Sequence, residues 1–430
     1  MQEQTSSNSL GERVPKLRFP EFEGEWDFEL FSDLFTFLSN NTLSRAELSE
    51  TGNIRNIHYG DILVKYTDVI NVDDEIIPFV SNASESKVRC GMLRTGDVII
   101  ADTAEDATVG KAIEIINYNN KPVVSGLHTM PCRPNRDFTA SFLGYYINSN
   151  AYHSQLYPYM QGIKVTSISK ANIGKTLIHF PSRSEQKKIV ELFNLIEKNF
   201  LIQKKLVKAL KLYKRGLLSK LFPQKGKGIP QYRFKEFTDV WKQRKVTELG
   251  NIYIGLVTTM TAHYTDHGTL LIRNSDIKDG KFVFDSEPIY LDDEFSEVNK
   301  SRRHKVGDVI TVHTGDVGTS AVITENEANS IGFATIVTRP NKEILDSYYL
   351  SVFLNTDKHK NWAVQMSTGD GRTNYNLREY TELIVPVPAV DEQKKIAKFI
   401  MTLNNLITLH QRKYNSYKKE KLALLQQMFI

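Results

Sequence analysis

The chain carries the same sequence pattern twice. PSRSEQKKIVELF begins at Pro181, and PAVDEQKKIAKFI begins at Pro388. Upstream of these motifs, VPKLRFPEFEGEW ends at Trp26 and IPQYRFKEFTDVW ends at Trp241, so two of the three tryptophans occupy equivalent places. Self-similarity over such long distances indicates that one structural unit is built twice. A chain of 430 residues is also too long for one ordinary domain,.

Three shorter matches lie between these motifs. ILVKYTDVI (62–70) matches LLIRNSDIK (270–278), TGDVIIADTAEDATVGKAIEI matches VGDVITVHTGDVGTSAVI, and CRPN at Cys132 matches TRPN at Thr338. The separation of the two copies changes from match to match, which indicates insertions and deletions in surface loops. Each unit is therefore expected to be a globular segment followed by a long helix.

The globular segments read as mixed α/β structure. Short β-branched runs, such as 98–100 and 309–312, are separated by Gly and Asp turns,. An aromatic stretch with helical spacing follows each RPN motif, and this spacing favours a packed core over a binding surface.

A long amphipathic helix is predicted after each EQKKI motif. Ser184 and Asp391 are suitable N-caps, and the carboxylates that follow suit the positive end of a helix dipole,. Apolar residues then recur with a heptad period. The a and d positions are Ile189, Leu192, Ile196, Leu206, Leu210, Tyr213 and Leu217 in the first helix, and Ile396, Phe399, Leu403, Leu406, Tyr417 and Leu424 in the second.

Each of these helices needs a partner, because alone it would expose an apolar stripe along its length. The two helices are expected to pair antiparallel, and the alternative is that each packs on its own globular segment. The sequence thus predicts an α+β protein with two mixed α/β domains separated by an antiparallel pair of long coiled-coil helices. The predicted segments are an N-terminal arm with the first domain (1–183), a central helix (184–222), a linker with the second domain (223–390) and a C-terminal helix (391–430).

Composition excludes several classes of protein. Two cysteines without a CxxC or Cys/His cluster give neither a disulfide framework nor a structural zinc site, which fits a reducing cytoplasm,. No apolar run approaches the roughly 20 residues of a membrane span, and the first residues are polar. A soluble, cytoplasmic protein is therefore expected.

The net charge of +5 permits a nucleic-acid partner without requiring one,. The distribution of charged residues along the chain is more informative, because ten basic residues and no acidic residue lie between Lys198 and Lys227. Such a run forms either a solvated helix face or a track for phosphates or for an acidic protein partner.

The duplicated order of GDVI, RPN, a Gly/Thr loop and EQKKI opening a long helix resembles the DNA-specificity subunit of type I restriction-modification enzymes. The resemblance covers nearly the whole chain. It implies two target recognition domains, each reading one half of a split site in double-stranded DNA. It also implies that the paired helices hold the domains apart and dock two methyltransferase (modification) subunits, with restriction/translocase subunits completing the full complex.

The same resemblance implies a non-catalytic chain without a cofactor of its own, since S-adenosylmethionine, and ATP with Mg²⁺, belong to the partner subunits. The sequence has no phosphate-binding GxxxxGK[ST] loop and no Asn/Asp-Pro-Pro-Tyr/Phe motif,. His313, Thr314 and Asp316 could suggest acid-base chemistry, but the equivalent turn at Asp102 and Thr103 has no histidine,. The alternatives are a specificity subunit of a related non-type-I restriction enzyme, a two-domain nuclease or methyltransferase, and a coiled-coil scaffold that binds no DNA.

Residues that read bases are expected to be polar or planar side chains on turns between strands, because groove edges present donors and acceptors. The candidates in the first copy are Lys65, Tyr66, Thr67, Glu105, Thr108, Lys164, Thr166, Ser167 and Lys170. The candidates in the second copy are Arg273, Asn274, Ser275, His313, Thr314, Thr319, Arg372, Thr373, Asn374 and Tyr375. Hydrogen bonding that stabilises the turns is the alternative role, especially for Asp68, Asp102 and Asp276.

The EQKKI motifs themselves suggest a docking surface. Gln186, Lys187, Gln393 and Lys394 are expected to point away from the apolar stripe of their helices. They would form either a solvated first turn or two equivalent surfaces, each accepting one copy of the same partner.

Overall fold

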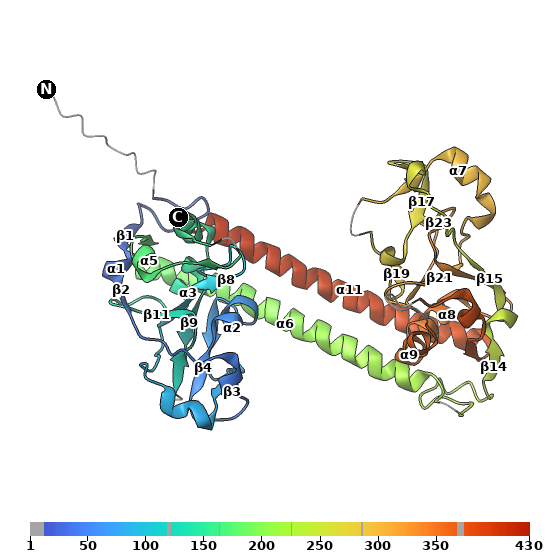
Figure 1. Ribbon diagram of the computed structural model, residues 1–430, viewed down its shortest axis with the longest axis horizontal. Helices are drawn as coiled ribbons and strands as arrows, with labels where there is room; N and C mark the ends of the chain where they lie inside the picture. Colours follow the sequence, from blue (N-terminus) through green and yellow to red (C-terminus); the bar gives the residue numbers. More distant parts are fainter. Residues whose placement is uncertain (1–12, 118–121, 163, 225, 285–286, 368–373) are drawn as a thin grey trace. The chain divides into compact units, whose positions relative to one another are not determined.

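The computed structural model describes residues 13–117, 122–162, 164–224, 226–284, 287–367 and 374–430 (Figure 1). The chain forms two compact units. The first unit comprises residues 1–202 and 413–430, and the second comprises residues 203–412. No helix among the described residues is long and apolar enough to cross a membrane.

The first unit contains two main sheets. A five-stranded sheet has the order β2 (Phe35–Phe37), β11 (Thr129–Pro134), β7 (Val98–Ala101), β9 (Ala112–Ile116) and β5 (Val69–Asn71). A four-stranded sheet has the order β10 (Val123–Ser125), β4 (Arg55–Ile57), β6 (Phe79–Val80) and β3 (Leu48–Ser49). Two short pairs join β1 (Asp27–Leu30) to β13 (Leu177–Phe180), and β8 (Thr103–Ala104) to β12 (Thr166–Ser167).

The aromatic stretch of the first unit forms its core. Every residue of α3 (Phe142–Ile147) is buried, as the helical spacing predicted. The remaining short α-helices are α1 (Phe31–Leu34), α2 (Tyr59–Val64), α4 (Asn150–His153) and α5 (Lys170–Ile173).

The second unit repeats the first. Its main sheet has the order β15 (Gly250–Ile254), β24 (Ile336–Pro340), β21 (Val309–Thr311) and β22 (Ser320–Val322), which matches the order β2-β11-β7-β9. Its second sheet has the order β16 (Tyr264–Thr265), β20 (Tyr290–Leu291), β17 (Thr269–Ile272) and β23 (Ile331–Gly332). Two short pairs join β14 (Lys242–Lys245) to β25 (Ile384–Val387), and β18 (Ile277–Lys278) to β19 (Lys281–Phe282).

The helices of this unit also follow the repeat. They are α7 (Asp293–Val298), α8 (Ser347–Leu354), α9 (Asp357–Met366) and α10 (Leu377–Thr381). All but one residue of α8 is buried, like α3 in the first unit. The mixed α/β structure and the duplication predicted from the sequence are confirmed.

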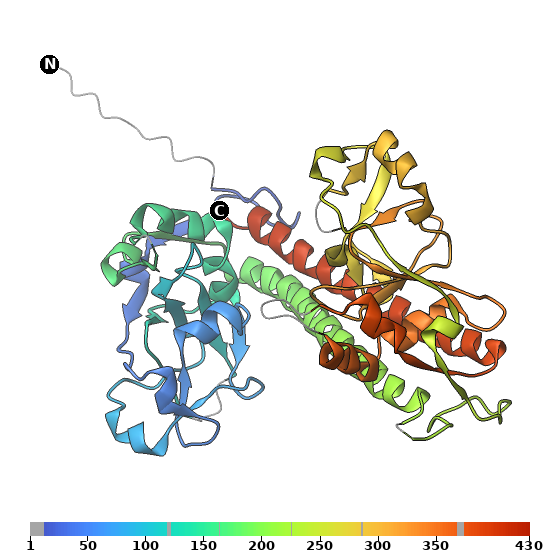
Figure 2. The same ribbon diagram turned by 45° about the vertical axis from the view of Figure 1, so that its right-hand side comes forward.

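Two long helices, α6 (Arg183–Leu221) and α11 (Val390–Gln427), contribute to both units. In the first unit Phe193 stacks on Phe429, and Phe200 stacks on Tyr414 with ring centroids 4.7 Å apart. In the second unit Gln203 lies beside His410. Residue numbers on the two helices therefore change in opposite directions, so the helices are antiparallel in each unit (Figure 1, Figure 2).

Both alternatives for helix packing are partly right. Each helix begins in the core of one unit and ends in the core of the other. The core of the first unit contains Ile189 and Phe193 of α6 and Leu425 of α11. The core of the second unit contains Ile396 and Ile400 of α11, and Leu218 and Leu221 of α6. The helices thus pair with each other and also pack on the globular domains.

The heptad assignment is wrong at some positions. Tyr213 and Phe399 are 59% and 42% exposed, whereas the neighbouring Lys214 and Ile400 are buried. A straight α-helix drifts away from a strict heptad repeat, and the buried stripe here must also face a domain core. The first helix also begins one residue earlier than expected, and Ser182 Oγ rather than Ser184 accepts a hydrogen bond from the Glu185 amide at 3.4 Å.

Candidate nucleic-acid interface

Two candidate loops of the first unit lie side by side. The turn after β7 contributes β8, and the segment that contains Lys164 contributes β12. Thr166 pairs with Ala104 and Ser167 pairs with Thr103 in an antiparallel bridge, and the Ile168 amide donates to the Asp102 carbonyl at 2.9 Å. Segments about sixty residues apart in the sequence therefore form one surface.

The second unit joins the equivalent segments. Thr314 forms an antiparallel bridge with Asn374, and its Oγ1 donates to Asn374 Oδ1 at 2.9 Å. The Tyr375 amide donates to the His313 carbonyl at 2.8 Å. The third candidate turn is attached here as well, because Asn274 Oδ1 accepts a hydrogen bond from the His313 amide at 2.8 Å.

Side-chain exposure separates the candidates. The exposed side chains are Lys65, Glu105, Thr108, Lys164, Ser167, Lys170 and Ser275. The half-buried side chains are Thr67, Thr166, Arg273, Asn274, His313, Thr314 and Asn374. Arg372 and Thr373 lie outside the described residues.

Three candidates belong to the interior, which contradicts the expectation that they lie exposed on turns. Tyr375 and Thr319 are 0% exposed, and Tyr66 is 3% exposed. The Tyr375 hydroxyl contacts His359 Nε2 at 3.3 Å inside the core, and burial raises the pKa of Tyr375. Thr319 Oγ1 donates to Asp316 Oδ2 at 2.6 Å, which stabilises its own turn. Tyr66 is buried among the aliphatic side chains of the β4–β5 region, and that burial also raises its pKa.

Internal contacts occupy some of the remaining candidates. Arg273 Nη2 lies 2.9 Å from Asp276 Oδ1, and this ion pair raises the pKa of the guanidinium. Lys65 Nζ donates to the Ile76 carbonyl. His313 Nδ1 lies 2.7 Å from Thr314 Oγ1, and burial lowers the pKa of the imidazole, so the ring is neutral at pH 7. Neutral imidazole offers one donor and one acceptor, which suits base edges better than it suits phosphates.

The glutamines of the EQKKI motifs are buried, which contradicts the expectation that all four motif residues point outward. Gln186 Oε1 accepts from the Thr139 amide at 2.9 Å, and Gln393 Oε1 accepts from the Asp346 amide at 2.8 Å. Each glutamine thereby fixes its helix to the loop that follows the RPN motif. Lys187 and Lys394 are exposed, as expected.

The glutamates of the same motifs form ion pairs that the sequence reading missed. Arg18 Nε and Nη2 each lie 2.8 Å from a Glu185 carboxylate oxygen. Arg233 Nε and Nη2 lie 2.7 and 2.8 Å from the two oxygens of Glu392. We call these the arm–helix ion pairs. Their signal was present in the sequence, because the duplicated RF and EQ motifs occur in equal number and in the same order.

No group of three His, Cys, Asp or Glu side chains that could hold a metal ion occurs among the described residues. Cys132 is buried and Cys90 is half-buried, and neither forms a disulfide.

The geometry defines a duplicated protein in which each unit presents a surface built from two or three joined loops. The family model for the type I restriction modification DNA specificity domain matches residues 23–212 and again 239–419. The chain belongs to this family. It is a type I restriction-modification specificity subunit with two target recognition domains.

Curated relatives support this assignment. The chain is 20% identical over 432 residues to a protein of Methanocaldococcus jannaschii that is described as the MjaX type I restriction enzyme specificity subunit. The match covers 96% of this chain and 95% of the relative. The specificity subunit of the EcoBI type I restriction enzyme of Escherichia coli is 27% identical over 141 residues, covering 32% of this chain and 28% of the relative.

Solved structures share the fold. The S subunit of a type I restriction-modification system from M. genitalium has a TM-score of 0.59 at 12% identity, covering 97% of this chain and 99% of that one. A chain from a structural study of assembly and conformational transition in the type I R-M system has a TM-score of 0.55 at 16% identity, covering 94% and 97%.

Proposed function

We propose that each unit reads one half of a bipartite site in double-stranded DNA with its joined loops. The observation that carries this proposal is that both units join the same two segments on one backbone frame, with differences at single side chains. A threonine of the first segment, Thr103 or Thr314, meets Ser167 in the first unit and Asn374 in the second, and the residue before it is Asp102 or His313. A common backbone frame with different donors and acceptors is what reading two different half-sites requires.

The exposed residues at these surfaces are the proposed base and phosphate contacts. Lys164 and Lys170 carry the positive charge of the first surface, and Ser167 and Glu105 supply neutral and acidic groups. In the second unit His313, Thr314 and Asn374 supply donors and acceptors. Glu can accept from cytosine N4, and Asn can pair with adenine N6 and N7.

The chain is proposed to contribute specificity without catalysis. His313 is already hydrogen-bonded to Thr314 within its turn, and the equivalent turn of the first unit has Asp102 and Thr103 instead. A function shared by both units therefore does not depend on this imidazole. S-adenosylmethionine, ATP and Mg²⁺ would be bound by the partner subunits.

The long helices are proposed to space the two domains and to dock two methyltransferase subunits. Both helices expose large apolar side chains that neither domain core covers. They include Leu195, Ile202 and Leu422 in the first unit, and Leu212, Tyr213, Phe399, Met401, Leu406 and Leu409 in the second. Exposed apolar side chains recurring along a helix are typical of protein interfaces. Lys187 and Lys394 stay in the proposal as flanking contacts, whereas the buried Gln186 and Gln393 do not.

Methylation mapping in cells that carry the complete system tests the reading role. The double variant Lys164→Ala/Ser167→Ala should relax the methylated sequence in one half-site only, and His313→Ala/Asn374→Ala should relax the other. Each bidentate or well-placed contact contributes about 1–3 kcal/mol of discrimination. Lys204→Ala, which removes an exposed lysine of α6, is the control and should leave both half-sites unchanged. If the variants methylate less DNA but keep the wild-type sequence preference, these residues do not read bases.

A further inference from the structure

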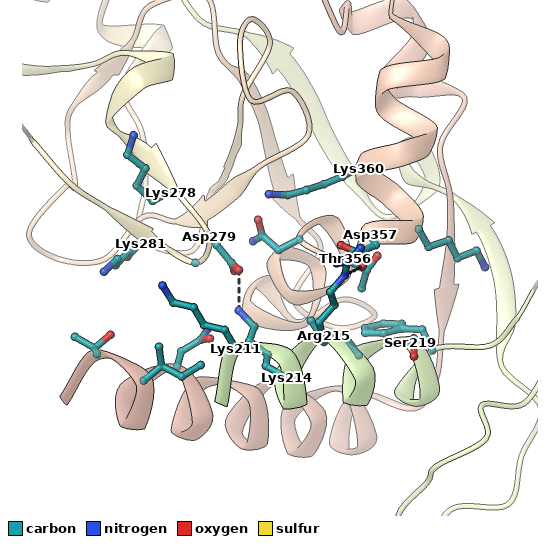
Figure 3. A pocket seen from close by; sticks show the side chains of 18 of the residues that line it. Lys211, Lys214, Arg215, Ser219, Lys278, Asp279, Lys281, Thr356, Asp357 and Lys360 are labelled. Atoms are coloured by element: carbon teal, nitrogen blue, oxygen red, sulfur yellow. Dashed lines mark hydrogen bonds and ion pairs between the residues drawn. The ribbon is translucent and has the colours of Figure 1, made fainter. Parts of the chain in front are cut away.

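A basic cleft lies in the second unit beside the joined loops. It has a volume of about 620 Å³ and is lined by the last turns of α6, the first half of α11, the β18–β19 turn and the start of α9 (Figure 3). Seven of its lining residues are Lys or Arg and two are Asp. The basic run between Lys198 and Lys227 thus contributes only Lys211, Lys214 and Arg215 to this cleft.

Some of these cations already have ion-pair or hydrogen-bond partners within the protein. Lys214 Nζ lies 2.7 Å from Asp279 Oδ2, and Arg215 is paired with Asp357. Lys358 Nζ donates to the Pro223 carbonyl at 3.0 Å. By contrast, Lys211, Lys278 and Lys281 form no ion pair with any residue that the structure describes. Three lysines from three different elements, α6, β18 and β19, therefore line one concave surface without an ion pair of their own, and such a surface attracts an anion,.

The equivalent place in the first unit has a different set of ion pairs. Two asparagines fix the correspondence, because Asn355 Nδ2 donates to the Ser320 and Ser351 carbonyls, as Asn148 Nδ2 does to the Ala112 and Gly144 carbonyls. Lys421, the counterpart of Lys214, is paired with Asp68 at 2.8 Å and also with Glu197.

The residue equivalent to Glu197 in the second unit is the uncharged Asn404, which lines the cleft. Conversely, three basic residues of the cleft have uncharged counterparts in the first unit. Lys278 corresponds to Ile70, Arg215 to Leu422 and Lys358 to Ala151. Lys211 and Lys214 have the basic counterparts Lys418 and Lys421, so the repeat accounts for part of the charge of the cleft, and the cations at Lys278, Arg215 and Lys358 are added in the second unit.

The cleft borders the joined loops of its unit. Lys360 Nζ, on its rim, lies 3.7 Å from Asp316 Oδ2 in the turn that carries His313. Lys278 follows directly on Asp276 and Ile277, and Asp276 anchors Arg273. A duplex that meets the joined loops would therefore continue toward these lysines.

We propose that this cleft binds backbone phosphates of the DNA next to the half-site read by the second unit. The proposal rests on the proposed function and adds a contact that is independent of sequence and confined to one unit. Compact ammonium groups suit phosphate diesters, and each neutralised phosphate releases counterions and so steepens the salt dependence of binding. An acidic segment of a partner protein is the competing occupant.

The experiment uses the full-length chain in complex with its methyltransferase partner and a fluorescent random-sequence duplex, titrated by anisotropy over a range of salt concentrations. The triple variant Lys211→Ala/Lys278→Ala/Lys281→Ala should lower the slope of log K against log salt by about 2–3. The matched control Lys204→Ala/Lys205→Ala/Lys208→Ala removes the same charge from exposed positions of α6 outside the cleft and should change the slope less. Replacing the three cleft lysines by Arg should retain the wild-type slope.

Equal slopes for the cleft variant and the control would overturn the proposal. An unchanged DNA slope with loss of partner mass in the cleft variant would overturn it in favour of an acidic protein segment. Failure of the wild-type complex to bind any duplex would reject the proposed function itself, and this outcome is distinct because it does not depend on the variants.

Discussion

Phe429 packs edge-on against Trp26 with ring centroids 6.2 Å apart, although the two residues lie near opposite ends of the chain. The same relationship recurs in the second unit, where Phe222 packs edge-on against Trp241 at 6.1 Å. Each domain core is therefore completed by a phenylalanine that follows directly on a long helix, Phe429 after α11 and Phe222 after α6.

Replacing Phe429 by Ala should destabilise the first unit by about 3–5 kcal/mol, because the ring is buried and contacts Trp26, Phe142, Tyr146 and Phe193,. Phe222→Ala should do the same to the second unit. Hydrogen exchange measured by mass spectrometry separates the two units. Faster exchange in both units for either single variant would show that the cores do not unfold separately.

The arm–helix ion pair should make a large contribution to the stability of the first unit. Arg18→Ala leaves the Glu185 carboxylate, which is 2% exposed, without its counter-charge, and unfolding in urea should show a loss of about 3 kcal/mol,. Arg13→Ala removes an exposed ion pair with Glu25 and should change little,. The double variant Arg18→Met/Glu185→Leu should recover most of the loss. A small effect of Arg18→Ala would mean that water reaches the Glu185 carboxylate.

Glu114 should make the first unit less stable as the pH rises. Burial raises the pKa of its carboxyl from 4.5 to about 7, although the Ser141 and Gly144 amides donate to its oxygens. Between these two pH values the folded state binds more protons than the unfolded state, so its free energy of unfolding falls by up to about 1.4 kcal/mol per pH unit. Above pH 7 the carboxyl is ionised in both states and the loss is complete.

Glu114→Gln mimics the protonated carboxyl and isolates this effect. The stability of the wild type relative to the variant should fall between pH 5 and pH 7 in urea unfolding experiments. A constant difference across that range would show that the two amide donors keep the carboxylate ionised throughout.

Lengthening both long helices tests the proposed spacing role. Seven residues inserted after Ile202 and after Arg412 preserve the heptad register of the pair,. The spacer between the methylated half-sites should lengthen while the outer bases stay the same. An insertion into only one helix disrupts the pairing and should abolish methylation. An unchanged spacer after the double insertion would reject the role of the helices as a spacer.

The repeat and the period of the apolar residues predicted the two units, the long helices and their antiparallel pairing, because these features depend on patterns spread over many residues. Whether a single polar residue is buried or exposed could not be predicted in the same way. Tyr375 was assigned to DNA reading, yet its ring fills the core of the second unit. Gln186 was placed on the outside of a helix, yet a backbone amide from a distant loop holds it inside. Whether a polar side chain on a turn is buried depends on packing partners that are remote in the sequence.

The two units also differ in the ion pairs formed at equivalent positions. Equivalent positions such as Glu197 and Asn404 align by motif, but their neighbours Lys421 and Lys214 have different acidic partners. The basic cleft therefore depends on how side chains pack within the second unit, and the aligned motifs alone do not predict it. Sequence similarity between the copies predicts the backbone frame, whereas the differences between them determine what each surface can bind.

The packing of Phe429 on Trp26 has a consequence for synthesis. A ribosome normally releases an N-terminal domain that can fold while the rest of the chain is still being made. Here the second unit, which ends at Arg412, is complete before the first, because the first unit needs residues 413–430. The earliest domain to be translated is thus the last to complete its core, and until residues 413–430 have emerged the aromatic surface around Trp26 stays exposed to other chains and to proteases.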